Sequence, residues 1–264
     1  MTLRDALDAA VPALTAAGCE TPQLDAELLI ADALGVDRAA LHAEPELRVS
    51  GAAARVIGER VRRRVAREPV AYILGRNGFR HIEVAVDARV LIPRPETELL
   101  VDVALELPEA ARVHEVGTGS GAVALALRQE RPDLVVSASD VSAAAVAVAR
   151  ENARRLGLSL EVVEADGLPP GVYDLVLANL PYVREDEWAG LQPEITRYEP
   201  REALVAGPDG LEAIRGLVAG APPGTRVALE HAPGQAPAVR ALLRGAETRP
   251  DLAGRERVTV GVVP

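Results

Sequence analysis

The chain contains no lysine, because all 29 of its basic residues are arginine. This absence excludes enzymes that form a Schiff base through lysine and NTPases whose phosphate-binding loop ends in lysine. Cysteine is nearly absent as well: Cys19 stands alone, so no disulfide can form within the chain, as expected in a reducing compartment. The four histidines lie apart from one another without metal-ligand spacing, so no metal site is predicted.

Two further absences concern membranes and nucleic acids. No apolar run approaches the roughly 20 residues that cross a bilayer, and the first residues lack the basic and apolar regions of a signal peptide. The formal net charge is −10, which disfavours a large nucleic-acid footprint. We therefore expect a cytoplasmic protein that binds neither membranes nor, in a stable complex, nucleic acids.

The apolar content is sufficient for one large core and a smaller one, since 48% of the 264 residues are hydrophobic. Residues 1–72 predict a small all-α domain, with helices that begin after Thr2, at Thr21-Pro22 and after Ser50. An arginine-rich run at residues 60–67 indicates either a solvated helix face, which we favour, or a surface for an acidic partner.

Residues 73–92 predict a β-hairpin linker. Apolar residues from Phe79 to Val86 include a period-two stretch, and the turn-like residues 87–89 precede a second short apolar run. Phe79 is the only phenylalanine of the chain, and it either packs this hairpin or contacts a ligand.

The next segment, Ile92-Pro-Arg-Pro-Glu-Thr-Glu98, is stiffened by two prolines and favours a helix start. It is either an ordinary lead-in to a helix or a lid over a cofactor. In the second case, Arg94 is available for a carboxylate.

Residues 93–264 predict a Rossmann-like α/β domain, because strand and helix patterns alternate from residue 112 onward. Strands are expected at 112–116, 134–139, 160–164, 173–178, 225–230 and 257–263. Helices are expected at 121–130, 143–156, 210–219 and 235–244. Ligands of such folds bind beyond the carboxyl ends of the strands, so the residues that follow each strand are the first candidates for chemistry.

The first three strand ends indicate a cofactor that contains a nucleoside. The first strand leads into the glycine loop Gly117-Thr-Gly-Ser-Gly121 after the acidic Glu115, and these glycines let the backbone approach a ligand closely. The second ends at Asp140, which can accept both ribose hydroxyls, and the third at Asp166-Gly167, which could reach an adenine amino group. The loop also satisfies the looser dinucleotide pattern, so a hydride-transfer enzyme is an alternative. Its G-x-G-x-G spacing after an acid fits S-adenosylmethionine better.

The fourth strand ends in Asn179-Leu-Pro-Tyr182. Pro181 fixes its own φ and biases Leu180 away from helical conformations, so the exit from the strand is extended and rigid. The Asn179 amide oxygen and the Leu180 carbonyl can then accept the two hydrogens of a planar amino group, with the Tyr182 ring packed on its plane. This geometry suits chemistry on an NH₂ nitrogen, although an ordinary proline-containing turn has the same pattern.

Several motifs together resemble those of the HemK/PrmC family, the methyltransferases that modify the glutamine of peptide chain release factors. They include Glu68-Pro-Val-Ala-Tyr-Ile-Leu-Gly75, Val90-Leu-Ile-Pro-Arg-Pro-Glu-Thr-Glu98, Glu115-Val-Gly-Thr-Gly-Ser-Gly121 and Asp251-Leu-Ala-Gly-Arg-Glu-Arg-Val258. The chain departs from the family's Asn-Pro-Pro-Tyr signature at Leu180, and Asn-Leu-Pro-Tyr is also similar to enzymes that dimethylate adenine in ribosomal RNA. Leucine still supplies the backbone carbonyl that the signature uses.

The resemblance implies a class I methyltransferase that moves a methyl group from S-adenosylmethionine to the N5 amide nitrogen of a glutamine. That glutamine would lie in the Gly-Gly-Gln loop of class 1 release factors, recognised by the N-terminal helices. The alternatives are a ribosomal-protein glutamine, an adenine in nucleic acid, or a non-catalytic adaptor that binds the cofactor.

The resemblance also implies roles for individual residues. The expected catalytic residues, which also bind the substrate, are Asn179, Leu180, Pro181 and Tyr182, with Phe79 and Arg94 as further substrate contacts. The expected cofactor-binding residues are Glu115, Gly117, Thr118, Gly119, Ser120, Gly121, Asp140, Asp166, Gly167 and Asn179.

Overall fold

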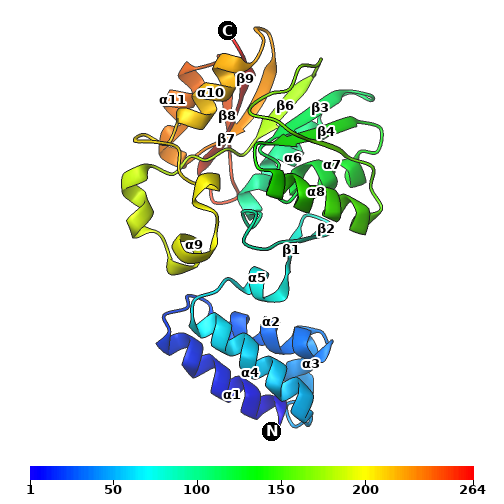
Figure 1. The fold of residues 1–264 in the computed structure, drawn as a ribbon, viewed down its shortest axis with the longest axis vertical. Coiled ribbons are helices and arrows are strands. Elements are labelled where there is room, and N and C mark those ends of the chain that lie inside the picture. Colours follow the sequence, from blue (N-terminus) through cyan, green and yellow to red (C-terminus); the bar gives the residue numbers. More distant parts are fainter. The chain divides into compact units, whose positions relative to one another are not determined.

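The computed structural model describes every residue from Met1 to Pro264 and divides the chain into two units. The first unit contains residues 1–75 and 192–198, and the second contains residues 76–191 and 199–264 (Figure 1). The sequence predicts boundaries after residues 72 and 92. In the structure, the hairpin strands belong to the second unit and residues 192–198 belong to the first. None of the helices combines the length and the apolar character that spanning a bilayer requires.

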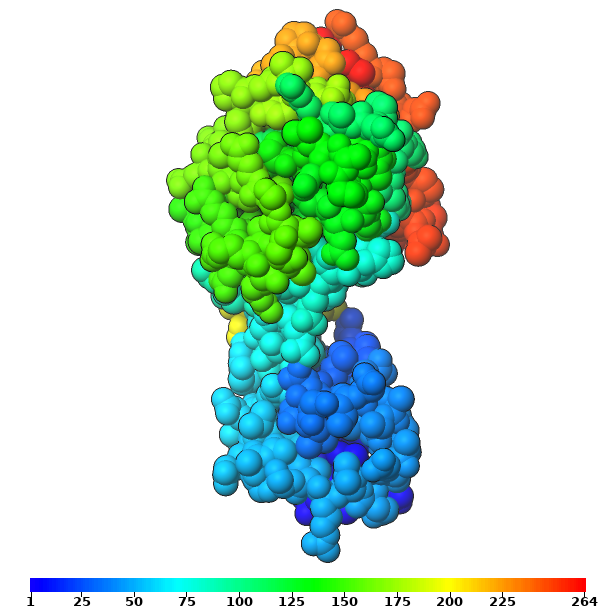
Figure 2. Space-filling view, turned by 90° about the vertical axis from the view of Figure 1, so that its right-hand side faces the viewer, coloured from blue at the N-terminus to red at the C-terminus, as the bar shows by residue number.

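The first unit is built from helices around a small apolar core. Thr2 and Ser50 accept hydrogen bonds from backbone amides of the helices that follow them, as their positions predict. Side chains such as Leu14, Ile30 and Leu41 are almost completely buried in this core, and the blue and light-blue residues pack closely in Figure 2. The helices are α1 (Leu3–Ala16), α2 (Pro22–Leu34), α3 (Arg38–Ala43), α4 (Gly51–Val65), α5 (Val70–Leu74) and α9 (Pro193–Tyr198).

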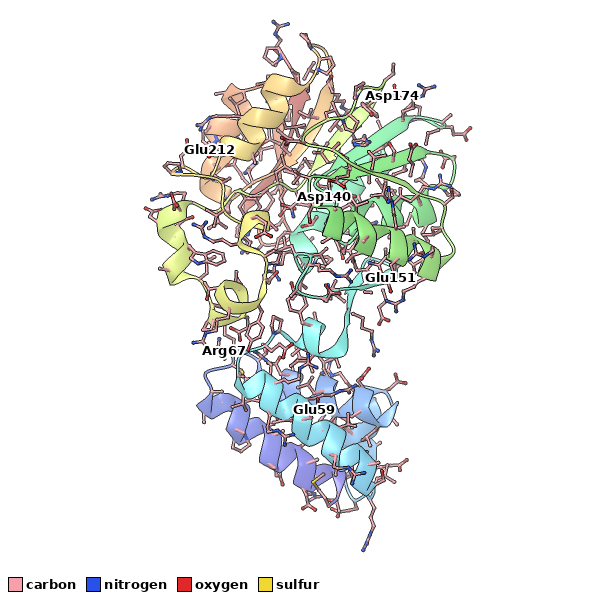
Figure 3. The ribbon with its side chains drawn as sticks, in the orientation of Figure 1. Glu59, Arg67, Asp140, Glu151, Asp174 and Glu212 are labelled. Atoms are coloured by element: carbon pink, nitrogen blue, oxygen red, sulfur yellow. The ribbon has the colours of Figure 1, made fainter.

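The arginine-rich run of residues 60–67 is only partly a solvated helix face, because Arg62 is exposed while Arg64 is buried. Arg64 is only 6% exposed and pairs with Asp25 and Glu194, each at 2.7 Å. Arg67, which is labelled in Figure 3, forms a two-point pair with the same Glu194. The physical reason is that α2 and α9 both present carboxylates to α4. These three helices come together only in the folded chain.

The predicted hairpin exists, but its turn is elsewhere. Strands β1 (Arg76–Phe79) and β2 (Ile82–Ala85) pair antiparallel through a turn at Arg80 and His81 rather than at residues 87–89. Arg80 adopts a φ of 49° in this turn. It is held there because its amide bonds Glu98 and its guanidinium bonds Glu130. The position of the turn is therefore set by these long-range contacts and not by local turn propensity.

The second unit contains a seven-stranded sheet in the order β5-β4-β3-β6-β7-β9-β8. The five strands from β5 to β7 in this order are parallel, and β9 runs antiparallel to both its neighbours. The strands are β3 (Arg112–Val116), β4 (Val135–Asp140), β5 (Glu161–Glu164), β6 (Leu175–Ala178), β7 (Arg226–Glu230), β8 (Arg244–Pro250) and β9 (Glu256–Val262). The predicted Rossmann-like α/β sheet is thereby confirmed.

Helices cover both faces of this sheet (Figure 1). On one face lie α6 (Glu98–Leu105), α7 (Ala122–Glu130) and α8 (Ala143–Leu156), which contact the parallel strands. On the other lie α10 (Glu212–Gly220) and α11 (Ala236–Ala241), which share an apolar cluster with Val176 and Leu229. Short 3-10 turns complete the unit at η1 (Pro95–Thr97), η2 (Glu185–Gly190), η3 (Arg201–Ala203) and η4 (Pro233–Gln235).

The sequence predicts six of the seven strands but not β8. This strand begins at Arg244, inside the stretch where a helix is expected, and it ends at Pro250. It lies at the edge of the sheet, pairs only with β9, and its register is irregular in two places. An edge strand with most side chains in solvent needs no apolar alternation, so periodicity cannot reveal it.

Candidate functional site

The candidate site lies where the chain reverses its path across the sheet, between β3 and β6. From β3 the chain proceeds to β4 and β5, and it returns to β6 on the other side of β3. Such switch points leave a crevice beyond the carboxyl ends of the two central strands. The register pairs Val116 with Ala178, so the glycine loop and the Asn179–Tyr182 turn emerge side by side. A Cβ added to Gly117 would lie 2.9 Å from Cδ2 of Leu180.

The glycine loop has the backbone that a close-fitting ligand requires. Gly117, Gly119 and Gly121 have φ values of 73°, 56° and 83°, a backbone region that residues with a side chain rarely adopt. A Cβ added to Gly119 would meet no atom within 4 Å, so this stretch of backbone borders open space. The amides of Gly117 and Thr118 both bond the Ser139 carbonyl, which ties the loop to β4.

The buried Glu115 side chain stabilises this loop through hydrogen bonds. Its Oε2 accepts the Thr118 hydroxyl at 2.6 Å and the Ala124 amide at 3.0 Å. The residue is 3% exposed, and burial raises the pKa of its carboxyl to about 8, although these hydrogen bonds oppose the rise. Glu115 therefore joins the strand, the loop and the first turn of α7.

Asp140 lies at the end of β4, beside the glycine loop (Figure 3). Its two carboxylate oxygens accept the amides of Gly119 at 2.8 Å and Ser142 at 2.9 Å. The loop that follows β5 joins the same place, because the Ala165 amide bonds the Asp140 carbonyl at 3.0 Å. Asp166 is the next residue and is exposed. The structure thus brings together three strand ends that are far apart in the sequence.

The Asn179 carboxamide is oriented by a residue that the sequence analysis did not single out. Its Nδ2 donates to Oγ1 of Thr97 at 3.0 Å. Thr97 is buried, and it lies in the proline-rich segment before α6. Because the NH₂ end of the amide is committed to Thr97, the Oδ1 end is the acceptor left for a ligand.

Glu230 is the second residue that the sequence analysis missed. It ends β7, and its Oε1 accepts the Tyr182 hydroxyl at 3.3 Å. Burial raises the pKa of Glu230 to about 7, and burial also raises the pKa of the Tyr182 phenol. The Tyr182 carbonyl accepts a hydrogen bond from Gln235. The rule that directs attention to strand ends would have found Glu230 had it been applied to the fifth predicted strand.

The proline-rich segment, residues 92–98, is held in place by hydrogen bonds and ion pairs to other parts of its unit. Glu199 accepts the guanidinium of Arg94 and the amide of Ile92, so Arg94 is paired within its own unit and is not free for a carboxylate. Glu96 pairs with Arg255 at 3.0 Å. These contacts tie the proline-rich segment to Glu199 and Arg255 of the same unit.

Phe79 and Asn152 are both buried in the second unit. Phe79 is 2% exposed, so in this structure it packs the core under the hairpin. Asn152 of α8 accepts the Ala85 amide and donates to the carbonyls of Ala85 and Ser120, which joins β2 to the glycine loop. No group of three or more His, Cys, Asp or Glu side chains is arranged to hold a metal ion.

Comparison with known proteins gives matches along nearly the whole chain. A family model described as the PrmC N-terminal domain matches residues 5–75, and one described as the methyltransferase small domain matches residues 95–194. The release factor glutamine methyltransferase of Deinococcus radiodurans is 41% identical over 270 residues, which cover 97% of both chains. That of Xylella fastidiosa strain Temecula1 is 43% identical over 274 residues, covering 96% of this chain and 98% of the relative.

A solved structure shares the fold at much lower identity. The catalytic domain of hMettl16, in complex with the MAT2A 3'UTR hairpin 6, is 17% identical with a TM-score of 0.52. The similarity covers 67% of this chain and 73% of that one. At this identity, the likeness supports the architecture of the sheet and its helices.

Proposed function

This chain belongs to the family of release factor glutamine methyltransferases, and from that premise we propose that it methylates the N5 amide nitrogen of a release-factor glutamine. The observation that carries the proposal is the pair of acceptors at the end of β6. The Asn179 oxygen is free because its nitrogen is bonded to Thr97, and the Leu180 carbonyl follows it in the turn.

The residues beside the turn fit S-adenosylmethionine as the methyl donor. The open backbone at Gly119 would admit the ligand closely, and Asp140 at the next strand end would accept ribose hydroxyls. Asp166 and Gly167 would lie toward the adenine, and Glu115 holds the loop in shape. When bound, the cofactor supplies a methyl group on a positively charged sulfur, which is a good leaving group.

The chain's own contribution is to present a poor nucleophile in the right orientation. An amide nitrogen reacts weakly because its lone pair is delocalised into the carbonyl. Asn179 and Leu180 would each accept one hydrogen of the glutamine amide, so the nitrogen faces the methyl group in line with the departing sulfur. Tyr182 would pack on the amide plane, with Pro181 keeping the turn rigid. Positioning of this kind can supply up to about 7–11 kcal/mol of the barrier in ideal cases.

No strong base needs to act before methyl transfer in this mechanism. The hydrogen-bonded amide attacks as a neutral group, and the surplus proton leaves the methylated nitrogen afterwards to water. Methyl transfer by orientation alone is consistent with the turn, whose groups are an amide, a carbonyl and a phenol.

The proposed substrate is the Gly-Gly-Gln loop of class 1 release factors, in a cytoplasmic setting. We assign recognition of the release factor to the helical residues 1–72 and chemistry to residues 93–264, with the hairpin linker between them. The support for this division is that each unit has its own core and that a separate family model matches each part.

The test is transfer of a labelled methyl group from S-adenosylmethionine to a purified release factor. The matched control is the same factor with the glutamine of its Gly-Gly-Gln motif changed to alanine. Label on the first and none on the second is the expected result. Equal labelling of both would contradict the assigned site. Label on neither would contradict the proposed substrate, and ribosomal proteins and then nucleic acids would be tested next.

A further inference from the structure

A buried carboxylate, Glu230, lies next to the Asn179–Tyr182 turn. It follows the register pair of Ala178 and Leu229, so it stands next to Asn179 at the edge of the sheet. Glu230 is only 1% exposed, and its Oε2 atom has no hydrogen-bond partner. Burying a carboxyl group in this way costs the fold free energy, which points to a role for Glu230 in the site.

Two side chains near the turn, Thr97 and Tyr182, interact with Glu230. Asn179 Nδ2 donates to Thr97 Oγ1 at 3.0 Å, which leaves the Thr97 hydroxyl with its own hydrogen to place. Interaction with Thr97 lowers the pKa of Glu230 and so favours its charged form, and the unpartnered Oε2 is the atom toward which the hydroxyl hydrogen can turn. On the other side, the Tyr182 hydroxyl donates to Glu230 at 3.3 Å. An ionised Glu230 therefore accepts the Tyr182 hydroxyl at one oxygen and offers its other, unpartnered oxygen to the Thr97 hydroxyl.

We infer that Thr97 and Glu230 are positioning residues, which hold the Asn179 carboxamide with its oxygen toward the substrate amide and fix Tyr182 at the same time. The inference rests on the proposed amide methylation. A carboxamide without a fixed partner for its nitrogen can turn by 180° and present a donor in place of an acceptor. A donor there would oppose the N–H groups of the glutamine amide, and the nitrogen would no longer face the methyl group.

Protonation of Glu230 would disturb this arrangement. Burial raises its pKa to about 7, while Thr97, Tyr182 and Arg257 lower it and Glu96 raises it further. A neutral Glu230 carries a hydrogen that competes with Asn179 for the Thr97 oxygen, so activity should fall as the pH drops below about 7. The charged and ionisable groups around Glu230 are Tyr182, Glu96 and Arg257, with Arg94 facing Tyr182 and His231 next in the chain.

The first test compares the wild type with Glu230→Gln. Rates of methyl transfer to a release factor are measured from about pH 5.5 to 9, with kcat and KM separated. We expect the wild-type kcat to rise through about pH 7 and the variant to be flat there and roughly tenfold or more slower. KM for both substrates should stay near the wild-type value. A variant with the wild-type rate and pH dependence would overturn the inference.

A second test does not depend on how Glu230→Gln folds. Thr97→Val removes the hydroxyl while keeping the shape, and Thr97→Ser keeps the hydroxyl. We expect Val to lower kcat by roughly 10- to 100-fold and Ser to restore most of the rate, with S-adenosylmethionine binding retained in both. Equal losses in Ser and Val, or loss of cofactor binding alone, would contradict the positioning role. Wild-type inactivity toward release factors would instead contradict the proposed function, so the two failures are distinguishable.

Discussion

Asn179 is the residue on which the proposed chemistry depends most directly. Its oxygen is left as an acceptor for the substrate because its nitrogen is bonded to Thr97. We expect Asn179→Ala to lower kcat by about 10²-fold or more, because the substrate amide loses one of its two acceptors and its orientation. Steady-state methyl transfer and calorimetric binding of S-adenosylmethionine, measured on the same preparation, check this. If rate and cofactor affinity fell equally, the residue would be serving the cofactor and not the substrate.

Leu180 is the residue at which the chain departs from the family's Asn-Pro-Pro-Tyr signature. Its backbone carbonyl is the proposed acceptor, while its side chain packs on Gly117 and the apolar cluster under α10. We expect Leu180→Pro to remain active, with kcat/KM reduced less than about tenfold, and to lose about 1–2 kcal/mol of stability from lost packing.

Leu180→Ala is the matched control for this substitution. It removes the same packing without adding a ring, so it should show a similar stability loss in denaturant unfolding. A Leu180→Pro variant that folds but is inactive would show that the turn needs the backbone freedom of leucine at this position.

At the scale of elements, Asn152 joins three pieces of the second unit. It lies on α8 and bonds both backbone groups of Ala85 on β2 and the Ser120 carbonyl in the glycine loop. We expect Asn152→Ala to cost about 2–4 kcal/mol of unfolding free energy, since buried backbone groups would lose their partners. Urea unfolding measures this, with Glu151→Ala on the solvent side of the same helix as control (Figure 3). Equal effects of the two substitutions would contradict the joining role.

The helix α9 is an element that the sequence places in one unit and the fold places in another. It lies between two segments of the second unit in the chain, yet its contacts belong to the first. Glu194 explains this, because it is the partner of both Arg64 and Arg67. Segments of six residues have too little apolar periodicity for such an assignment from sequence.

At the scale of the whole molecule, all 29 residues of the Lys and Arg class are arginine, and several of them pair with carboxylates that are far away in the sequence. Burial alone would raise the pKa of Glu194, but hydrogen bonds from Arg67 and Arg64 outweigh burial and hold it below the ordinary value of 4.5. We expect Glu194→Gln to lower the free energy of unfolding of the full chain by roughly 3 kcal/mol at neutral pH, because the buried arginines lose a partner.

The pH dependence of this effect has a definite sign. A carboxyl group whose pKa is lower in the folded state stabilises the fold above the unfolded pKa, and loses this contribution as the pH falls through the folded pKa. The difference between wild type and Glu194→Gln should therefore shrink below about pH 4 in denaturant unfolding. Glu59→Gln, at an exposed position of α4, is the control. A difference that stays constant with pH would show that packing and not charge holds the helix.

The sequence by itself determined the class of fold, the alternation of buried strands and helices in the second unit, and the tetrapeptide of the site. Apolar periodicity marks the buried parallel strands, and glycines and prolines mark the loops that end them, because these are local properties of the chain. The sequence also determined the family, since matches run along nearly the whole chain.

Only the tertiary structure decided which residues hold the site in place. Thr97, Glu199 and Glu230 are separated from their partners by dozens of residues or more, and no periodicity records a contact of that range. The same is true of the hairpin turn at Arg80, which carboxylates from two helices hold in an uncommon conformation. Local conformational propensity determines where most strands and turns form. The orientation of a buried side chain depends instead on the residues that the whole fold packs against it.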